Sequence, residues 1–98
     1  HVYYTAAAAI MMKPGVEHYR WGLPILDAVA AEYHYAEEPL YRRALAAYRY
    51  WRLKPQAPNR IKMARQRLRS LISASRKAPI DPERVDEARR YLSEVGAQ

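Results

Sequence analysis

Residues 39–77, PLYRRALAAYRYWRLKPQAPNRIKMARQRLRSLISASRK, decide the fold of this chain. The first part carries apolar residues at the helical spacings of four, three and four, namely Leu40, Ala44, Ala47 and Trp51. The last part carries a second series of this kind, namely Ile61, Ala64, Leu68, Leu71 and Ile72. Pro55 and Pro58 stand between the two series and interrupt a helix, because proline lacks a backbone N–H. The stretch therefore predicts two helices, Pro39 to Lys54 and Asn59 to about Lys77, with Asn59 as the second N-cap.

Residues 81–96 predict a further helix with well-marked ends. Asp81 is a favourable N-cap, Pro82 suits the first helical position, and Glu83 suits the positive end of the helix dipole. Gly96 is a typical stop signal. One more helix is expected at about residues 24–38, because Pro24 can occupy its first position.

The region before Pro24 has no clear period. A short helix is expected within Ala6–Met12, ended by the breaker Lys13-Pro14-Gly15. No segment alternates as a strand does. We therefore expect an all-α protein, a small antiparallel bundle of three to four helices. Residues 1–38 would form a Tyr/Trp-rich N-terminal extension with a helix at about residues 24–38, and residues 39–98 a basic three-helix region.

The composition argues against an enzyme. The 98 residues include no cysteine and three glycines, which excludes a disulfide scaffold, a thiolate metal site and a Gly-rich phosphate loop. His34 and Glu38 are four residues apart, but a metal site needs a third and fourth ligand that no other segment supplies. The serines of the third expected helix have no histidine in a triad pattern. We expect no catalytic site and no bound metal.

Charge is concentrated in the middle of the chain. No acidic residue occurs between Glu38 and Asp81, and this interval holds twelve of the seventeen Lys and Arg residues. The segments on either side carry net charges of about −3 and −2. An unmixed basic block of this kind usually has an anionic partner. The residues expected to bind an acidic protein or an anionic lipid headgroup are Arg42, Arg43, Lys62, Arg65, Arg69 and Arg76.

The aromatic residues are concentrated in the first half of the chain. Ten of the eleven lie in residues 1–51, and all are Tyr or Trp. Such side chains join a large apolar area to a polar tip and are common at interfaces. The aromatics expected to contact other subunits are Tyr19, Trp21, Tyr33, Tyr48 and Trp51.

Leu40-Tyr41-Arg42, followed by Arg43-Ala44-Leu45, resembles the signature of the LYR-motif family, small mitochondrial proteins of three antiparallel helices. Members follow the motif helix with a basic helix that bears an aliphatic–Arg step, similar to Leu68-Arg69. A turn with Asp-Pro then starts the third helix, as Asp81-Pro82 does here. The resemblance covers about residues 40–95.

Two positions depart from the family pattern. A phenylalanine and an asparagine usually follow the aliphatic–Arg step, where this chain has Ile72 and Ser75. The motif also lies further from the N-terminus than in most members.

The resemblance implies a non-enzymatic adaptor. LYR proteins serve as accessory subunits or assembly factors of respiratory complexes and iron–sulfur machinery, and many bind the acidic mitochondrial acyl carrier protein. The acyl-phosphopantetheine of that partner would be the one cofactor involved. The side chains that would line a slot for its acyl chain are Leu40, Ala44, Leu68 and Ile72.

Two functions therefore stay open. The first is an accessory subunit of a mitochondrial inner-membrane assembly, a respiratory complex or ATP synthase, on the matrix side, acting through contacts with other subunits. The second is an RNA-binding component of a mitochondrial ribosome, since Arg-rich helices also bind phosphate. The longest uncharged stretch near the N-terminus, Val2 to Met12, is too short to cross a membrane, so no transmembrane helix is expected. The first residue, His1, fits either a processed chain or one that starts inside a longer product.

Overall fold

The computed structural model describes Ala7 and residues 15–96, which form four α-helices. These are α2 (Val16–Glu32), α3 (Glu37–Leu53), α4 (Pro58–Ala74) and α5 (Pro82–Gly96). The described residues contain no strand, so the prediction of a small all-α helical bundle is confirmed. Apart from Ala7, the short helix expected within Ala6–Met12 lies outside the described residues, as does the region before it.

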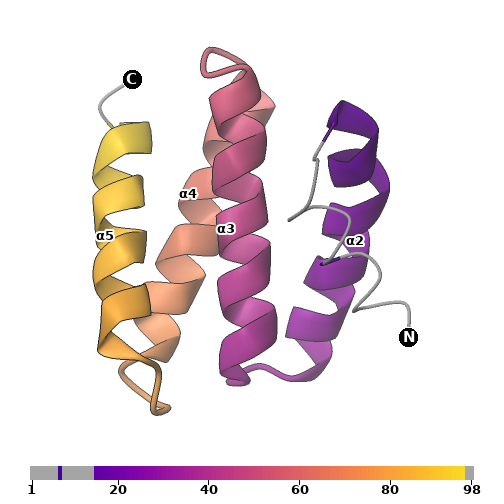
Figure 1. The fold of residues 1–98 in the computed structure, drawn as a ribbon. Coiled ribbons are helices and arrows are strands. Elements are labelled where there is room, and N and C mark those ends of the chain that lie inside the picture. The colour runs from indigo at the N-terminus through magenta and orange to yellow at the C-terminus, as the bar shows by residue number, and fades with distance from the viewer. Residues whose placement is uncertain (1–6, 8–14, 97–98) are drawn as a thin grey trace.

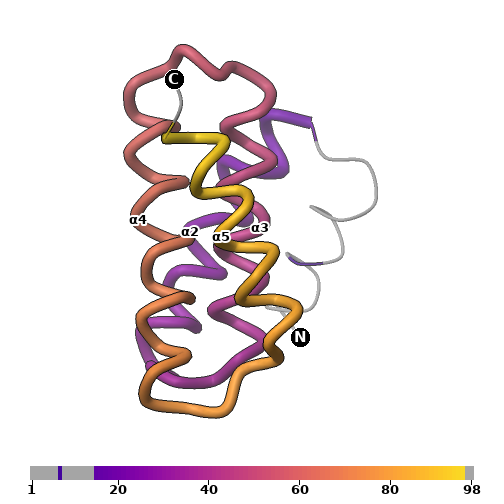
Figure 2. Tube along the Cα trace, turned by 90° about the vertical axis from the view of Figure 1, so that its left-hand side faces the viewer, coloured from indigo at the N-terminus to yellow at the C-terminus, as the bar shows by residue number. Residues whose placement is uncertain are grey.

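Helix α3 lies at the centre and packs against each of the other three described helices (Figure 1). Helix α4 packs against α3 and α5, whereas α2 packs against α3 alone. The turns after α2 and α4 lie at one end of the bundle, and the turn after α3 lies at the other (Figures 1 and 2). Consecutive helices are therefore antiparallel, and α3 and α5 run in the same direction.

The two faces of α3 are buried in two separate clusters. One face joins α4 and α5 in the main core, with residues such as Leu40, Leu68 and Val85 at its centre. The other face joins α2 through Tyr19, Leu23, Leu26, Ala46 and Ala47. Because α3 is covered on both sides, it needs small residues between its larger ones, which explains its alanines. Helix α2 thus adds a layer to the three-helix unit of α3, α4 and α5, and its Ala30 joins the main core of that unit.

Helix α2 begins eight residues earlier than expected. Its N-terminus is capped at Gly15, whose N–H donates to Nδ1 of His18 at 3.1 Å, while the His18 N–H donates to the Gly15 carbonyl oxygen at 3.1 Å. Pro24 therefore lies inside the helix rather than at its start. It is tolerated there because it occupies the exposed side, where water can bond to the carbonyl group that proline leaves without a donor.

The starts of the other helices follow the sequence more closely. Helix α4 begins at Pro58, with Ala57 and not Asn59 at the N-cap position, so the expected side-chain cap is absent. Helix α5 begins at Pro82 as predicted, and Oδ1 of Asp81 accepts a hydrogen bond from the Glu83 N–H at 2.9 Å. Of the helices described, none combines the length and the apolar character that crossing a membrane requires.

Candidate partner-binding groove

An open groove of about 940 Å³ runs along α4. Its longest wall is α4, from Pro58 to Ala74 and on to Lys77 in the following turn. The opposite wall is the C-terminal end of α2 with His34 and Tyr35 of the next turn, and Leu40 and Arg43 of α3 complete the lining. The groove exists because α2 and α4 both pack against α3 but not against each other.

The groove is strongly basic. Its described lining contains no Asp or Glu and five Lys or Arg side chains, namely Arg43, Lys62, Arg65, Arg69 and Lys77. Between these cations lie small side chains, namely Ala30, Ala31, Ser70, Ser73 and Ala74. An incoming group therefore meets positive charge at the edges and little bulk between them.

Most of these cations have no partner within the described part of the chain. The side chains of Lys62, Arg65, Arg69 and Lys77 make no hydrogen bond or ion pair there. Nη1 of Arg43 lies 3.8 Å from Oδ1 of Asp27, a long ion pair. The Nε atoms of Arg43 and Arg65 are buried without a hydrogen-bond acceptor. Buried donors without an acceptor are unfavourable for the fold.

Burial lowers the pKa of the Arg43 guanidinium. The Asp27 carboxylate opposes this effect, and the neighbouring Arg67 reinforces it. The group remains a cation at physiological pH, because an arginine pKa is far above neutrality. An added anion would relieve this crowding of positive charge.

Asp27 connects α2 to α4. Its Oδ2 accepts a hydrogen bond from Nη2 of Arg67 at 2.7 Å, and its Oδ1 accepts one from Nε at 3.2 Å. This two-point contact is the strong form of a carboxylate–arginine pair. This pair could not be predicted from the sequence, because Asp27 and Arg67 are 40 residues apart and belong to helices that do not pack directly.

The structure brings together four of the six cations expected to bind a partner. Arg43, Lys62, Arg65 and Arg69 line the groove, but Arg42 and Arg76 do not. Nε of Arg42 instead donates to Oε2 of Glu38 at 3.2 Å, and Arg76 lies exposed beyond the end of α4. Lining residues that were not expected to bind a partner include His34, Tyr35 and Lys77. Lys77 continues the four-residue spacing of Arg69 and Ser73, which was the available signal.

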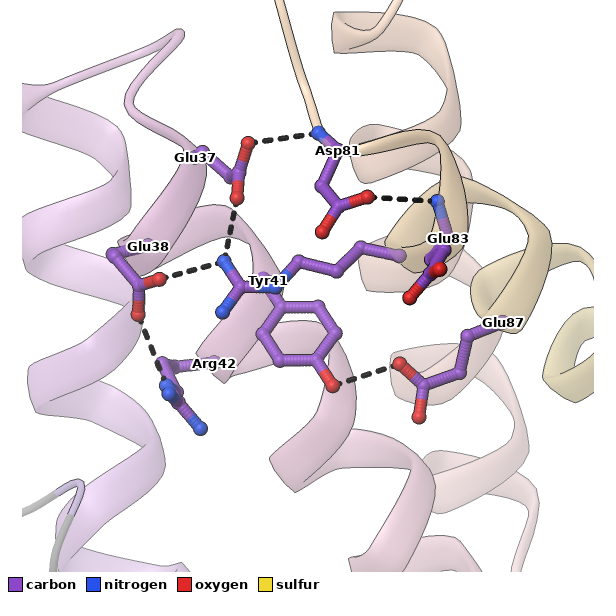
Figure 3. A network of polar contacts seen from close by, with 8 residues as sticks. Glu37, Glu38, Tyr41, Arg42, Asp81, Glu83 and Glu87 are labelled. Carbon is purple, nitrogen blue, oxygen red and sulfur yellow. Dashed lines mark hydrogen bonds and ion pairs between the residues drawn. The ribbon is translucent and has the colours of Figure 1, made fainter.

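The side chains of Leu40 and Tyr41 in the Leu-Tyr-Arg tripeptide make contacts that hold the helices together. Leu40 lies in the main core. The Tyr41 hydroxyl donates to Oε1 of Glu87 on α5 at 2.7 Å (Figure 3), and the Arg84 guanidinium lies 4.2 Å from the centre of its ring. Burial, assisted by the Glu87 carboxylate, raises the pKa of Tyr41 to about 12. The tripeptide thus joins the start of α3 to α5.

Glu37 and Glu38 converge on one cation. Adjacent residues of a helix normally point apart. In the structure Nη1 of Arg84 lies 2.6 Å from Oε2 of Glu37 and 2.6 Å from Oε1 of Glu38. The Arg84 hydrogen bond lowers the pKa of Glu38. Oε1 of Glu37 also accepts the Asp81 N–H at 2.9 Å (Figure 3), so the first turn of α3 holds the first turn of α5.

Three of the five aromatics expected at interfaces are core residues instead. Tyr19, Tyr48 and Trp51 are each at most 3% exposed. Two of them are satisfied inside the chain, because the Tyr48 hydroxyl donates to Oε2 of Glu94 at 2.7 Å and the Trp51 indole N–H donates to the Pro55 carbonyl oxygen at 3.0 Å. Trp21 and Tyr33 are exposed, at 41% and 56%.

The side chains expected to line an acyl slot fill the main core. Leu40, Ala44 and Leu68 are buried, and Ile72 packs against them from the edge. The cavity beside Ala44 and Leu68 measures about 10 Å³, which holds about one water molecule at most. An acyl chain could enter this region only if the helices moved apart.

Within the described residues, no three His, Asp or Glu side chains gather in a way that could hold a metal ion. Comparison of the chain with family models, with characterised proteins and with solved structures gives no match.

Proposed function

We propose that this chain is a non-enzymatic accessory subunit of a multi-protein assembly and that the groove along α4 binds an acidic partner protein. The observation that carries the proposal is the set of groove cations without partners in the described structure. Like charges held together in this way repel one another, and a complementary negative surface removes that cost.

A protein partner suits the groove better than RNA. Proteins that bind single-stranded RNA combine phosphate contacts with aromatic platforms on which the bases stack. In the described lining of the groove the aromatic side chains are His34 and Tyr35, both at the end of α2. The α4 wall offers Ser70, Ser73 and Gln66 between its cations instead. These groups can donate hydrogen bonds to carboxylates and backbone carbonyls. An RNA-binding ribosomal role is the second candidate function.

The resemblance to LYR-motif proteins suggests which assembly this is. It favours a respiratory complex or ATP synthase at the matrix side of the mitochondrial inner membrane, with acyl carrier protein as a candidate acidic partner. Because the core at Ala44 and Leu68 is closed, we propose that the partner docks by its protein surface. An acyl chain would enter only with a movement of the helices.

Native purification tests this proposal. The tagged chain would be expressed in the cells that produce it, purified in mild detergent, and analysed by mass spectrometry and for RNA. We expect stoichiometric recovery of an acidic protein as part of an inner-membrane assembly. Recovery of ribosomal RNA with ribosomal proteins would overturn the proposal in favour of the RNA-binding role, and recovery of the chain as a free monomer would overturn both.

A further inference from the structure

We infer that the groove binds a single α-helix of its partner, amphipathic and acidic along one edge, laid lengthwise against α4. This inference rests on the proposed function and specifies which part of an acidic partner the groove recognises. It is drawn from the size of the groove, from the spacing of its cations and from the small residues between them.

The size of the groove fits a helix that is partly sunk into it. The α4 wall from Pro58 to Ala74 has 17 residues, which at 1.5 Å per residue gives a length of about 25 Å. A partner helix of this length and about 10 Å in diameter occupies roughly 2,000 Å³. The groove measures about 940 Å³. It therefore accommodates a little under half of such a helix, which leaves the other side for the rest of the partner.

The cations of α4 are spaced to meet a helix. Lys62, Arg65 and Arg69 are separated by three and four residues, so they project from one side of α4. A partner helix that runs alongside presents carboxylates at the same height when it carries them at positions i, i+3 and i+7, or i, i+4 and i+7. Each long cation can then reach one carboxylate.

The lining between the cations allows close approach. Two helices pack with their axes about 8–10 Å apart, and the shorter distances require small side chains at the contact. Ala30 and Ala31 on the α2 side and Ser70, Ser73 and Ala74 on α4 provide such contacts. Leu40 and Ile61 add apolar surface to the same lining. The partner helix therefore needs an apolar stripe that faces the groove and a carboxylate edge beside it that faces α4.

Synthetic peptides can test this inference on the full chain. The first peptide is a labelled 17-residue helix with leucines along one stripe and three glutamates on the edge next to it. The second has the same composition, with the glutamates moved to the side opposite the leucines. Fluorescence anisotropy gives the Kd of each. We expect the first peptide to bind at least about tenfold more tightly than the second.

Two charge variants locate the binding. Lys62→Glu with Arg69→Glu reverses two groove cations, and Arg89→Glu with Arg90→Glu makes the same charge change on the exposed side of α5. All four side chains are exposed, so both variants are expected to fold, which circular dichroism checks. The groove variant should weaken binding of the first peptide by about tenfold or more, and the α5 variant should change it by less than about threefold. Equal loss in both variants would overturn the inference.

The remaining outcomes separate this inference from the proposed function. A single-stranded RNA 12-mer and vesicles that contain phosphatidylserine serve as alternative probes. The inference is overturned if the two peptides bind equally, or if RNA or vesicles bind with dependence on Lys62 and Arg69 while neither peptide does. An acidic protein that still copurifies through the groove would then leave the proposed function intact, with a non-helical surface of that protein as the occupant.

Discussion

The Tyr41 hydroxyl donates a hydrogen bond to Glu87 across the interface of α3 and α5 at 2.7 Å. Seven residues later on both helices the contact is repeated, because the Tyr48 hydroxyl donates to Glu94 at 2.7 Å. The equal offset of 46 residues in the two pairs reflects the parallel course of α3 and α5. Tyr91 completes the interface, with its ring stacked 3.9 Å from that of Tyr48 and its hydroxyl bonded to Oε2 of Glu87 at 2.8 Å. These contacts fix the register of the three-helix unit.

The two Tyr–Glu pairs should differ in their contribution to stability. Glu87 is half-buried, whereas Glu94 is exposed and can replace a lost donor with water. We expect Tyr41→Phe to lower the free energy of unfolding by roughly 1.5 to 3 kcal/mol, the range for hydrogen bonds to charged groups. Tyr48→Phe should cost less than about 1 kcal/mol. Urea denaturation measures both, and a larger cost for Tyr48→Phe would contradict the role given to Glu87.

Stability should fall in alkaline solution as these tyrosines ionise. Burial and the accepting carboxylates raise the pKa values of Tyr41 and Tyr48 from 10.0 to about 12. The fold thus favours the neutral phenols, so their contribution is complete below pH 10 and is lost as the pH rises from 10 to about 12. Urea denaturation across this range should show a steady loss. The double variant Tyr41→Phe, Tyr48→Phe should lose less stability over the same range, and an unchanged pH dependence would contradict this assignment.

The attachment of α2 should depend on Asp27. Asp27→Asn removes the charge that pairs with Arg67 and Arg43, all of them largely buried. We expect a loss of about 1–3 kcal/mol and faster hydrogen exchange in α2 than in α5. The control is Asp86→Asn, whose pair with Arg89 is exposed and 3.5 Å long and should contribute about 0–1 kcal/mol. Unchanged exchange in α2 would contradict the account of Asp27.

The closed core should resist enlargement at Ala44. This residue is 1% exposed, and the cavity beside it is about 10 Å³. Ala44→Leu should therefore lower the free energy of unfolding by about 1–3 kcal/mol through overpacking. Ala31→Leu, at an exposed position of α2, should change it by less than about 0.5 kcal/mol. Full tolerance of Ala44→Leu in a denaturation experiment would indicate that the helices separate easily, as an acyl slot requires.

Local signals in the sequence predicted some elements well. Asp81 and Pro82 define the start of α5 through backbone effects that act within one turn, and the structure places it there. Pro24 led to a wrong prediction for the start of α2, because proline suits both the first turn of a helix and an exposed interior position. The sequence does not show which side of the helix will be exposed. The helical period places Lys62, Arg65, Arg69 and Arg76 along one side of the expected helix. The first three line the groove, whereas Arg76 lies beyond the end of α4 and does not.

Features that depend on which helices pack together could not be predicted from the sequence. Tyr48 and Trp51 have the chemistry of interface residues, and only the packing of α3 against α4 and α5 makes them core residues. Asp27 and Arg67 become partners because α2 and α4 flank the same helix. Arg42 was grouped with Arg43 as a partner-binding cation, yet adjacent residues of a helix point in different directions, and Arg42 pairs with Glu38 instead.

The most direct test of the central claim is a quantitative comparison of copurified proteins. The unchanged chain, the Lys62→Glu, Arg69→Glu variant and the Arg89→Glu, Arg90→Glu variant would each be purified natively and their partners quantified by mass spectrometry. The account predicts an acidic partner that is retained by the unchanged chain and the α5 variant and largely lost from the groove variant. Retention of that partner by the groove variant, or its loss from both variants alike, would contradict the claim that the groove along α4 binds it.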